Sequence, residues 1–234
     1  MRRRAICIAA ALASLAGAPA HAGVQSAAYG EPTTRYAHGV LGDAIEYGAL
    51  EVTLTDGRQI TLRLPQERVF EDIAPRLADV DGDGDAEIIV VESAQTAGAR
   101  LAIYDETGLV AATPYIGRTN RWLAPLGAAD LDGDGHIELA YIDRPHLAKT
   151  LRIWRFSQGA LRPVADQPGL TNHRIGEDFI SGGIVSCDGV PTIVTANANW
   201  SRIMQSVLKG GRVQTTDAGA FTPDGLAAAS KDCP

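Results

Sequence analysis

The chain has 234 residues, of which 45% are hydrophobic and 21% are charged. This length is sufficient for one large core or two small ones, and the composition is that of a globular protein rather than a disordered one. The chain has 21 basic and 28 acidic residues, which gives a formal charge of −7. We therefore expect no nucleic-acid partner, because phosphate recognition requires a surface rich in Lys and Arg.

Residues 1–22 have the pattern of a secretory signal peptide. Three arginines at positions 2–4 precede an apolar run at residues 5–15, and Ala20-His21-Ala22 is a small-x-small cleavage site. The run is too short for a permanent membrane anchor, and a buried N-terminal helix is the alternative. We expect an exported chain, periplasmic or extracellular, in which residues 23–234 form a single domain with no further membrane span.

The remaining sequence contains an internal repeat of about 51 residues. The glycines Gly57, Gly108 and Gly159 are spaced 51 positions apart, and Gly211 follows 52 positions later. Each of these glycines follows a short run of alternating apolar residues, which is the pattern of a β-strand that enters a tight turn. The spacing therefore predicts about four copies of one structural unit.

The pattern within each repeat is that of strands. Residues 86–92 and 137–143 are continuous apolar runs, typical of strands buried on both faces. We therefore predict an all-β fold, a small β-propeller of about four four-stranded blades. A β-sandwich with coincidental spacing is the alternative. Because the first repeat begins midway through a blade, we expect the C-terminal tail to supply a strand that closes the ring beside residues 36–64.

Two acidic loops, one repeat apart, are the clearest candidates for a metal site. Each has Asp at positions 1, 3 and 5, Gly at position 6 and Glu at position 9, and a main-chain carbonyl at position 7 would complete the ligand set. Oxygen ligands of this charge and flexibility favour calcium. An EF-hand is excluded, since position 12 is Val90 or Tyr141 rather than Glu. Asp-Gly turns that bind no ion are the alternative. A degenerate third copy has Ile184 and Ser186 at the ligand positions, so we predict no ion there.

At these loops the chain resembles the FG-GAP/VCBS-type repeat family, which forms propeller blades in integrin α-chain heads and in many exported bacterial proteins. The resemblance implies that calcium lies in the loop between the two innermost strands of a blade and makes that loop rigid. The family's site residues correspond here to Asp79, Asp81, Asp83, Asp85 and Glu87, and to Asp130, Asp132, Asp134, His136 and Glu138.

The loops at the other ends of the predicted strands are rich in aromatic and bidentate side chains, which suit a small polar ligand, a glycan or a peptide. Ordinary polar loops with ion pairs between blades are the alternative. The candidate ligand-binding residues are Arg68, Glu92, Arg121, Trp122, Asp143, His146, Arg174, Asn197 and Trp200.

Two cysteines follow the predicted signal. An even pair in an exported chain favours one disulfide, so we expect Cys187 and Cys233 to join the C-terminal tail to the body of the domain. Two separate free thiols are the alternative.

No nucleophile-elbow, HExxH or P-loop motif occurs in the sequence. We therefore expect a non-enzymatic, exported, monomeric calcium-binding module that recognises a protein, glycan or small polar ligand. The alternative is a calcium-stabilised carbohydrate-active hydrolase or lyase, with its site on the rim opposite the calcium loops near His146 and Trp200.

Overall fold

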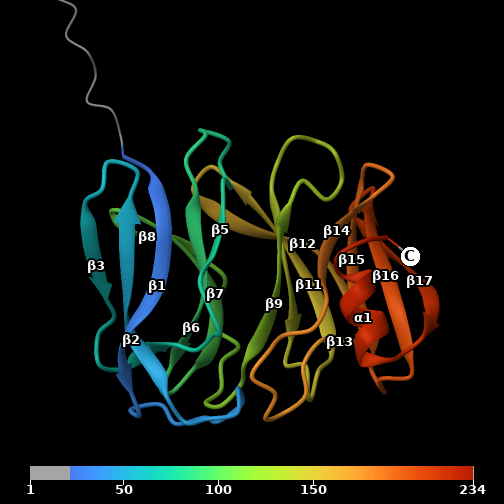
Figure 1. Cartoon of the computed structure of the whole chain (residues 1–234), viewed down its shortest axis with the longest axis horizontal. Helices are drawn as coiled ribbons and strands as arrows, with labels where there is room; N and C mark the ends of the chain where they lie inside the picture. Colours follow the sequence, from blue (N-terminus) through green and yellow to red (C-terminus); the bar gives the residue numbers. More distant parts are fainter. Residues whose placement is uncertain (1–21, 234) are drawn as a thin grey trace, which may run out of the picture.

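The computed structural model describes residues 22–233, so the predicted signal peptide lies almost entirely outside the described residues. The described chain is all-β apart from one short helix, which confirms the all-β part of the predicted fold. Its strands form three antiparallel sheets that lie side by side (Figure 1). The first sheet contains β1 (Val24–Thr33), β2 (Glu46–Leu54), β3 (Gln59–Arg63), β4 (Arg68–Phe70), β5 (Arg76–Ala78), β6 (Glu87–Ala94), β7 (Gly98–Asp105) and β8 (Gly108–Ala112).

The second and third sheets repeat one four-stranded pattern. The second sheet has the order β12-β11-β10-β9, and in the third β13 and β14 both pair with β15. In the same way, β4 and β5 both pair with β6 in the first sheet. In the first and third sheets, two short strands therefore stand where the second sheet has the single strand β9. The strands are β9 (Leu123–Ala129), β10 (Glu138–Asp143), β11 (Thr150–Ser157), β12 (Ala160–Pro168), β13 (Leu170–Thr171), β14 (Gly183–Cys187), β15 (Val190–Asn197), β16 (Arg202–Lys209) and β17 (Arg212–Ala220).

The two apolar runs lie in the structure as expected. Strands β6 and β10 are buried along almost their whole length. Side chains of β6 pack against Leu50 and Val52 of the first sheet on one face, while Ile89 and Val91 join the cluster that reaches the second sheet. The core therefore consists of one apolar cluster enclosed by the first sheet itself and of apolar layers between neighbouring sheets.

The sheets form a row along the long axis of the molecule, with β1–β3 at one end and β15–β17 at the other (Figure 1). A closed four-bladed ring is not confirmed. The C-terminal tail does not supply the expected closing strand beside residues 36–64. It forms α1 (Pro223–Ala229) instead, and Leu226 and Ala229 of this helix pack against the third sheet.

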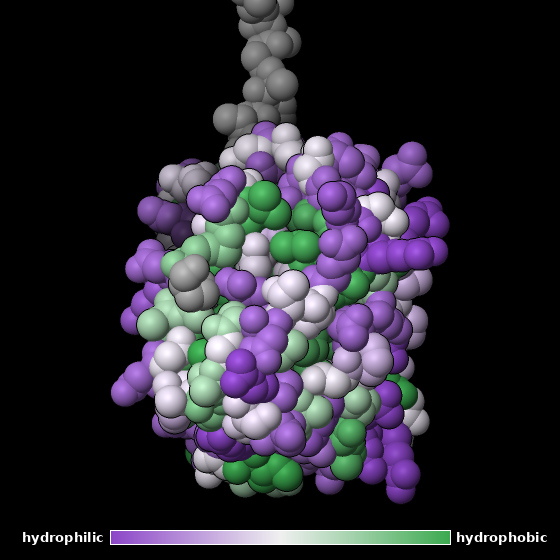
Figure 2. Space-filling model, turned by 90° about the vertical axis from the view of Figure 1, so that its right-hand side faces the viewer, coloured by the Kyte–Doolittle hydropathy of each residue, from purple (hydrophilic) through white to green (hydrophobic). Residues whose placement is uncertain are grey.

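Local sequence explains why the tail is helical. The Thr222 side chain accepts a hydrogen bond from the backbone N–H of Gly225 at 2.9 Å, which caps the helix, and Pro223 follows directly as a favourable first residue. Alanines then favour the helix. Figure 2 faces this end of the molecule, where hydrophilic and hydrophobic residues are interspersed.

Cys187 and Cys233 form the expected disulfide, with their Cα atoms 5.4 Å apart. Cys187 ends β14 and Cys233 follows α1, so the bond fixes the tail to the third sheet. No helix within residues 22–233 is long and apolar enough to cross a membrane.

Residues 34–45, which connect β1 and β2, run along the lower edge in Figure 1 and are called the strap. The strap is bonded to loops that come much later in the sequence. The Tyr36 hydroxyl accepts a hydrogen bond from the Asn120 N–H at 2.9 Å, and the Val40 carbonyl accepts one from the Gly176 N–H at 3.1 Å. The strap therefore connects the first sheet to the lower loops of the other two.

Candidate metal loops and the opposite rim

The first acidic loop, residues 79–86, connects β5 to β6 at the upper edge in Figure 1. Asp79 accepts hydrogen bonds from the backbone N–H groups of Gly82, at 2.7 Å, and Gly84, at 3.1 Å. Glu87 is buried, and its carboxylate accepts a bond from the Val80 N–H at 2.8 Å. These bonds fold the loop around Asp79 and direct the Glu87 carboxylate back toward the first residues of the loop.

The second acidic loop, residues 130–137, has the same geometry. Asp130 accepts bonds from the N–H groups of Gly133, at 2.7 Å, and Gly135, at 2.9 Å, and the Glu138 carboxylate accepts one from the Leu131 N–H at 2.8 Å. The two loops lie next to each other around a shared cavity of about 480 Å³. The sequence repeat is therefore also a repeat of loop conformation.

Each loop brings three carboxylates together. Ligand oxygens of Asp79, Asp81 and Glu87 lie within 4.8 Å of one another, as do those of Asp130, Asp132 and Glu138. These two clusters could hold metal ions. The other predicted ligands are outside the clusters: Asp83 accepts a bond from the Asp85 N–H, and Asp134 accepts one from the His136 N–H.

The electrostatics of the two loops differ. In the first loop, burial raises the pKa of Glu87 to about 7, and the carboxylates of Asp81 and Asp83 add to the rise. In the second loop, the Arg155 guanidinium lies among the carboxylates, at 2.8 Å from Asp132 and 2.5 Å from Glu138. It also contacts Asp134 at 2.6 Å. Among the ion pairs of the described residues, the first loop has no such cation.

Sequence reasoning did not identify Arg155 as a member of the second cluster. Arg155 pairs with Glu138 across β10 and β11, whereas Tyr104, 51 positions before Arg155, pairs with Ile88 rather than with Glu87. Arg155 is a single arginine within a predicted strand, and its place opposite Glu138 follows only from the register of β10 and β11.

On the opposite rim, Glu92 is the centre of a buried network rather than part of an open site. Its carboxylate is fully buried and contacts Arg68 at 2.8 Å and Arg100 at 2.9 Å. The hydroxyls of Tyr104 and Tyr115 donate to it at 2.7 and 2.6 Å. Every oxygen of Glu92 is therefore occupied by the chain's own groups.

Asp143 is also engaged with neighbouring side chains. It contacts Arg144 at 2.8 Å and Arg152 at 2.9 Å, and Arg152 also contacts Asp166. These contacts link β10, β11 and β12. The alternative for the rim was ion pairs between blades, whereas these pairs join strands of a single sheet.

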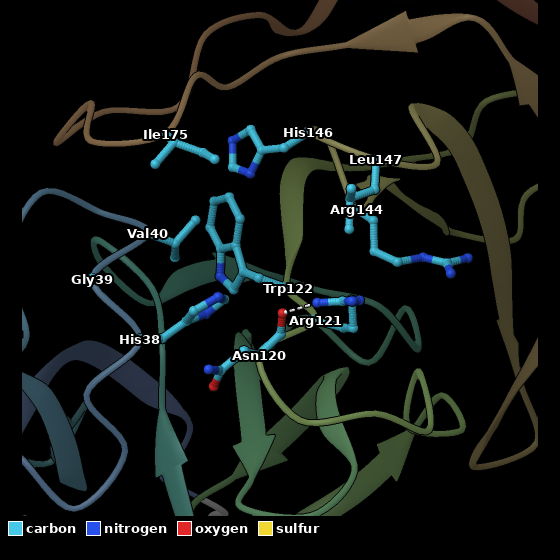
Figure 3. Close-up of a pocket in the computed structure, with 10 residues that line it drawn as sticks. All are labelled: His38, Gly39, Val40, Asn120, Arg121, Trp122, Arg144, His146, Leu147 and Ile175. Atoms are coloured by element: carbon cyan, nitrogen blue, oxygen red, sulfur yellow. Dashed lines mark hydrogen bonds between the residues drawn. The ribbon is translucent and has the colours of Figure 1, made fainter.

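Three of the predicted rim residues meet in one cavity. Arg121, Trp122 and His146 line a space of about 290 Å³, which Figure 3 shows, together with His38 from the strap. His146 Nε2 lies 2.9 Å from His173 Nδ1, and His173 Nε2 lies 2.9 Å from the Glu177 carbonyl. Burial and the neighbouring His173 lower the pKa of His146 to about 4, so this imidazole is neutral at pH 7.

The remaining three rim residues lie elsewhere. The Arg174 guanidinium lies over the Trp200 ring, 4.1 Å from its centroid, in a separate groove beside α1. Asn197 bonds to Ser201 in the turn between β15 and β16. His146 and Trp200 therefore line different cavities, whereas the alternative interpretation as a hydrolase or lyase placed both at one rim site.

A buried carboxylate next to the cavity was not predicted from the sequence. Glu71 is buried and contacts His38 Nδ1 at 2.5 Å and the Ser93 hydroxyl. Its backbone carbonyl accepts a bond from the Trp122 indole N–H at 2.8 Å. Glu71 therefore positions both an imidazole and an indole of the cavity wall. Its partners are 22 to 51 positions away in the sequence, so no local motif marks it.

Comparison with known proteins supports the repeat. Residues 79–141, which contain both acidic loops, match the FG-GAP-like repeat family. No curated protein sequence matches the chain significantly. The match favours a binding or interaction module, and it coincides with the segment in which the loop geometry repeats.

Proposed function

We propose that the protein is an exported, calcium-stabilised binding module with a single domain at residues 23–234, preceded by a signal peptide at residues 1–22. The observation that carries the proposal is the pair of acidic loops with matching geometry. The Cys187–Cys233 disulfide is compatible with an oxidising compartment. The module would act as a monomer and bind a protein, glycan or small polar ligand on the rim opposite the loops.

The donor set fits calcium. All side-chain donors in the two clusters are carboxylate oxygens, and calcium accepts such ligands in flexible geometries. Asp79, Asp81 and Glu87 would hold one ion, and Asp130, Asp132 and Glu138 a second. Asp83 and Asp134, with the main-chain carbonyls of Asp85 and His136, would contribute as the family pattern implies. Bound calcium would neutralise these carboxylates and cross-link each loop.

The finer architecture is also a proposal. We regard each four-stranded unit as a blade of a propeller of about four blades that is opened into a row. The family match, the constant repeat spacing and the antiparallel strand order support this interpretation.

Calcium is expected to raise the melting temperature of the protein, and magnesium much less. A ligand that binds only the folded state stabilises it by mass action, by about 2.7 kcal/mol at 100 times its dissociation constant. Thermal unfolding followed by circular dichroism with calcium, magnesium or chelator measures this effect.

The matched control is the double variant Asp81→Ala/Asp132→Ala, which removes one carboxylate from each cluster and should lose most of the calcium-specific rise. Absence of any shift in millimolar calcium would contradict the proposal and leave the loops as Asp-Gly turns.

The two loops are expected to bind calcium unequally, because Arg155 contacts Asp132 and Glu138, which the ion would need at the second loop. In a calorimetric calcium titration, the first site should bind at least about tenfold more tightly than the second, a difference of about 1.4 kcal/mol. Arg155→Met should remove the competing cation and bring the second site closer to the first.

Arg152→Met is the control for this titration, since Arg152 lies on the same strand and contacts Asp143 and Asp166 rather than the loop. Two sites of equal affinity in the unsubstituted protein would show that Arg155 does not compete with the ion.

A further inference from the structure

The cavity on the opposite rim is lined by the strap and by three other segments that connect strands. His38 and Val40 come from the strap, Trp122 from the segment before β9, His146 from the turn between β10 and β11, and Ile175 from the segment after β13. In Figure 3 these side chains surround the Trp122 indole, while Arg121 and Arg144 extend to one side. The volume is about 290 Å³, at the small end of the range for ligand pockets.

The charge of the cavity is opposite to that of the chain. None of the ten lining residues is acidic, although the chain has 28 acidic residues and a formal charge of −7. The lining includes two guanidinium groups and two imidazoles. A cavity with this lining favours an anionic ligand over a cationic one.

Most of the basic groups already have partners. Arg144 contacts Asp143 at 2.8 Å, and His38 contacts the Glu71 carboxylate. His146 is held by His173. Arg121 donates only to the Asn120 carbonyl, at 2.9 Å, and no ion pair of the described residues includes it. Arg121 is therefore the cation that remains for a ligand.

Two apolar side chains of the lining are largely exposed to solvent. Leu147 is 63% exposed and Ile175 is 72% exposed, although both are large apolar side chains beside the cavity. A ligand with an apolar body would cover them and remove this surface from water. The cavity therefore combines an apolar wall with one unpaired guanidinium.

We propose that this cavity binds a small organic carboxylate with an apolar body. The carboxylate pairs with the Arg121 guanidinium, which is suited to bidentate recognition of such a group, and the apolar body lies against Leu147, Ile175 and Trp122. This assignment rests on the proposed function as a binding module, and it specifies the ligand class for the rim opposite the acidic loops.

The test is a calorimetric titration of the calcium-loaded protein with 3-phenylpropionate and, in parallel, with its uncharged amide. The acid is expected to bind at least tenfold more tightly than the amide. Arg121→Gln should weaken binding of the acid at least tenfold and leave the amide unaffected. Arg118→Gln is the matched control, because Arg118 is an exposed arginine of the same loop outside the cavity lining, and it should change nothing.

Equal binding of acid and amide, or full retention of acid binding in Arg121→Gln, would overturn the proposal, as would absence of binding of the acid at 10 mM. The melting curve of Arg121→Gln in calcium and in chelator is the folding check. If the calcium-dependent rise is present and 3-phenylpropionate does not bind, only the ligand assignment fails. If the rise is absent and the acid binds, the calcium role fails instead.

Discussion

Replacement of Glu92 by Gln is expected to lower the free energy of unfolding by about 3–5 kcal/mol, the usual cost of breaking a buried ion pair by removing one partner. The Glu92 side chain is fully buried, and the partner side chains of Arg68 and Arg100 are only 28% and 15% exposed. The substituted amide keeps one acceptor oxygen and no negative charge, so the guanidinium groups and the hydroxyls of Tyr104 and Tyr115 lose the second oxygen and the charge that they share. Urea denaturation at pH 7 measures the loss.

This effect is expected to depend on pH. Burial raises the pKa of Glu92, but hydrogen bonds from Tyr115, Arg100 and Tyr104 outweigh burial and hold it below its ordinary value. A carboxyl group with a lowered pKa in the folded state contributes stability above its unfolded-state pKa, and this stability is lost as the pH falls through the folded-state pKa. The difference in stability between the protein and Glu92→Gln should therefore shrink below about pH 4.5.

Glu67→Gln is the control for this comparison, because Glu67 is an exposed glutamate close to the same network. It should change the free energy of unfolding by less than about 0.5 kcal/mol. A loss below about 1 kcal/mol for Glu92→Gln would contradict a structural role and revive the rim interpretation in which Glu92 contacts a ligand.

Removal of the disulfide in the double variant Cys187→Ser/Cys233→Ser is expected to lower the free energy of unfolding by about 4 kcal/mol. The bond closes a loop with a sequence separation of 46 residues, and the chain-entropy model gives this magnitude for a loop of that length. The tail should loosen first, because only Leu226 and Ala229 of α1 are buried against the third sheet.

Reduction of the unsubstituted protein with dithiothreitol should produce the same loss of stability as the double variant. Agreement between the two would assign the effect to the bond rather than to the serine side chains. A loss below about 1 kcal/mol would mean that α1 remains docked through its apolar contacts alone.

The sequence predicted the features that depend on local pattern. Gly159 and Gly211 lie in the turns between β11 and β12 and between β16 and β17, and Gly108 begins β8 directly after its turn. All three have positive φ, a backbone conformation that glycine adopts at the lowest cost. The acidic loops were predicted for the same reason: their fold depends on hydrogen bonds within a few residues.

The features that the sequence did not predict depend on contacts between distant segments. The interruption between β4 and β5 follows from the pairing of both with β6, and no local signal marks it. The position of Arg155 depends on the register between β10 and β11. The tail was expected to be a strand because ring closure was assumed, yet its capping threonine, proline and alanines were a helix signal that could have been recognised.

The strap has a consequence for the order of folding. Each sheet is built from neighbouring hairpins, so its strands can pair soon after they are synthesised. The strap residues Tyr36 and Val40, in contrast, bond to Asn120 and Gly176, which come 84 and 136 positions later. Closing such long loops costs chain entropy before any contact repays it, so the strap docks only after the later sheets exist. The cavity that it helps to line is therefore completed at the end of folding, and reopening of the strap would dismantle the cavity while the sheets remain paired.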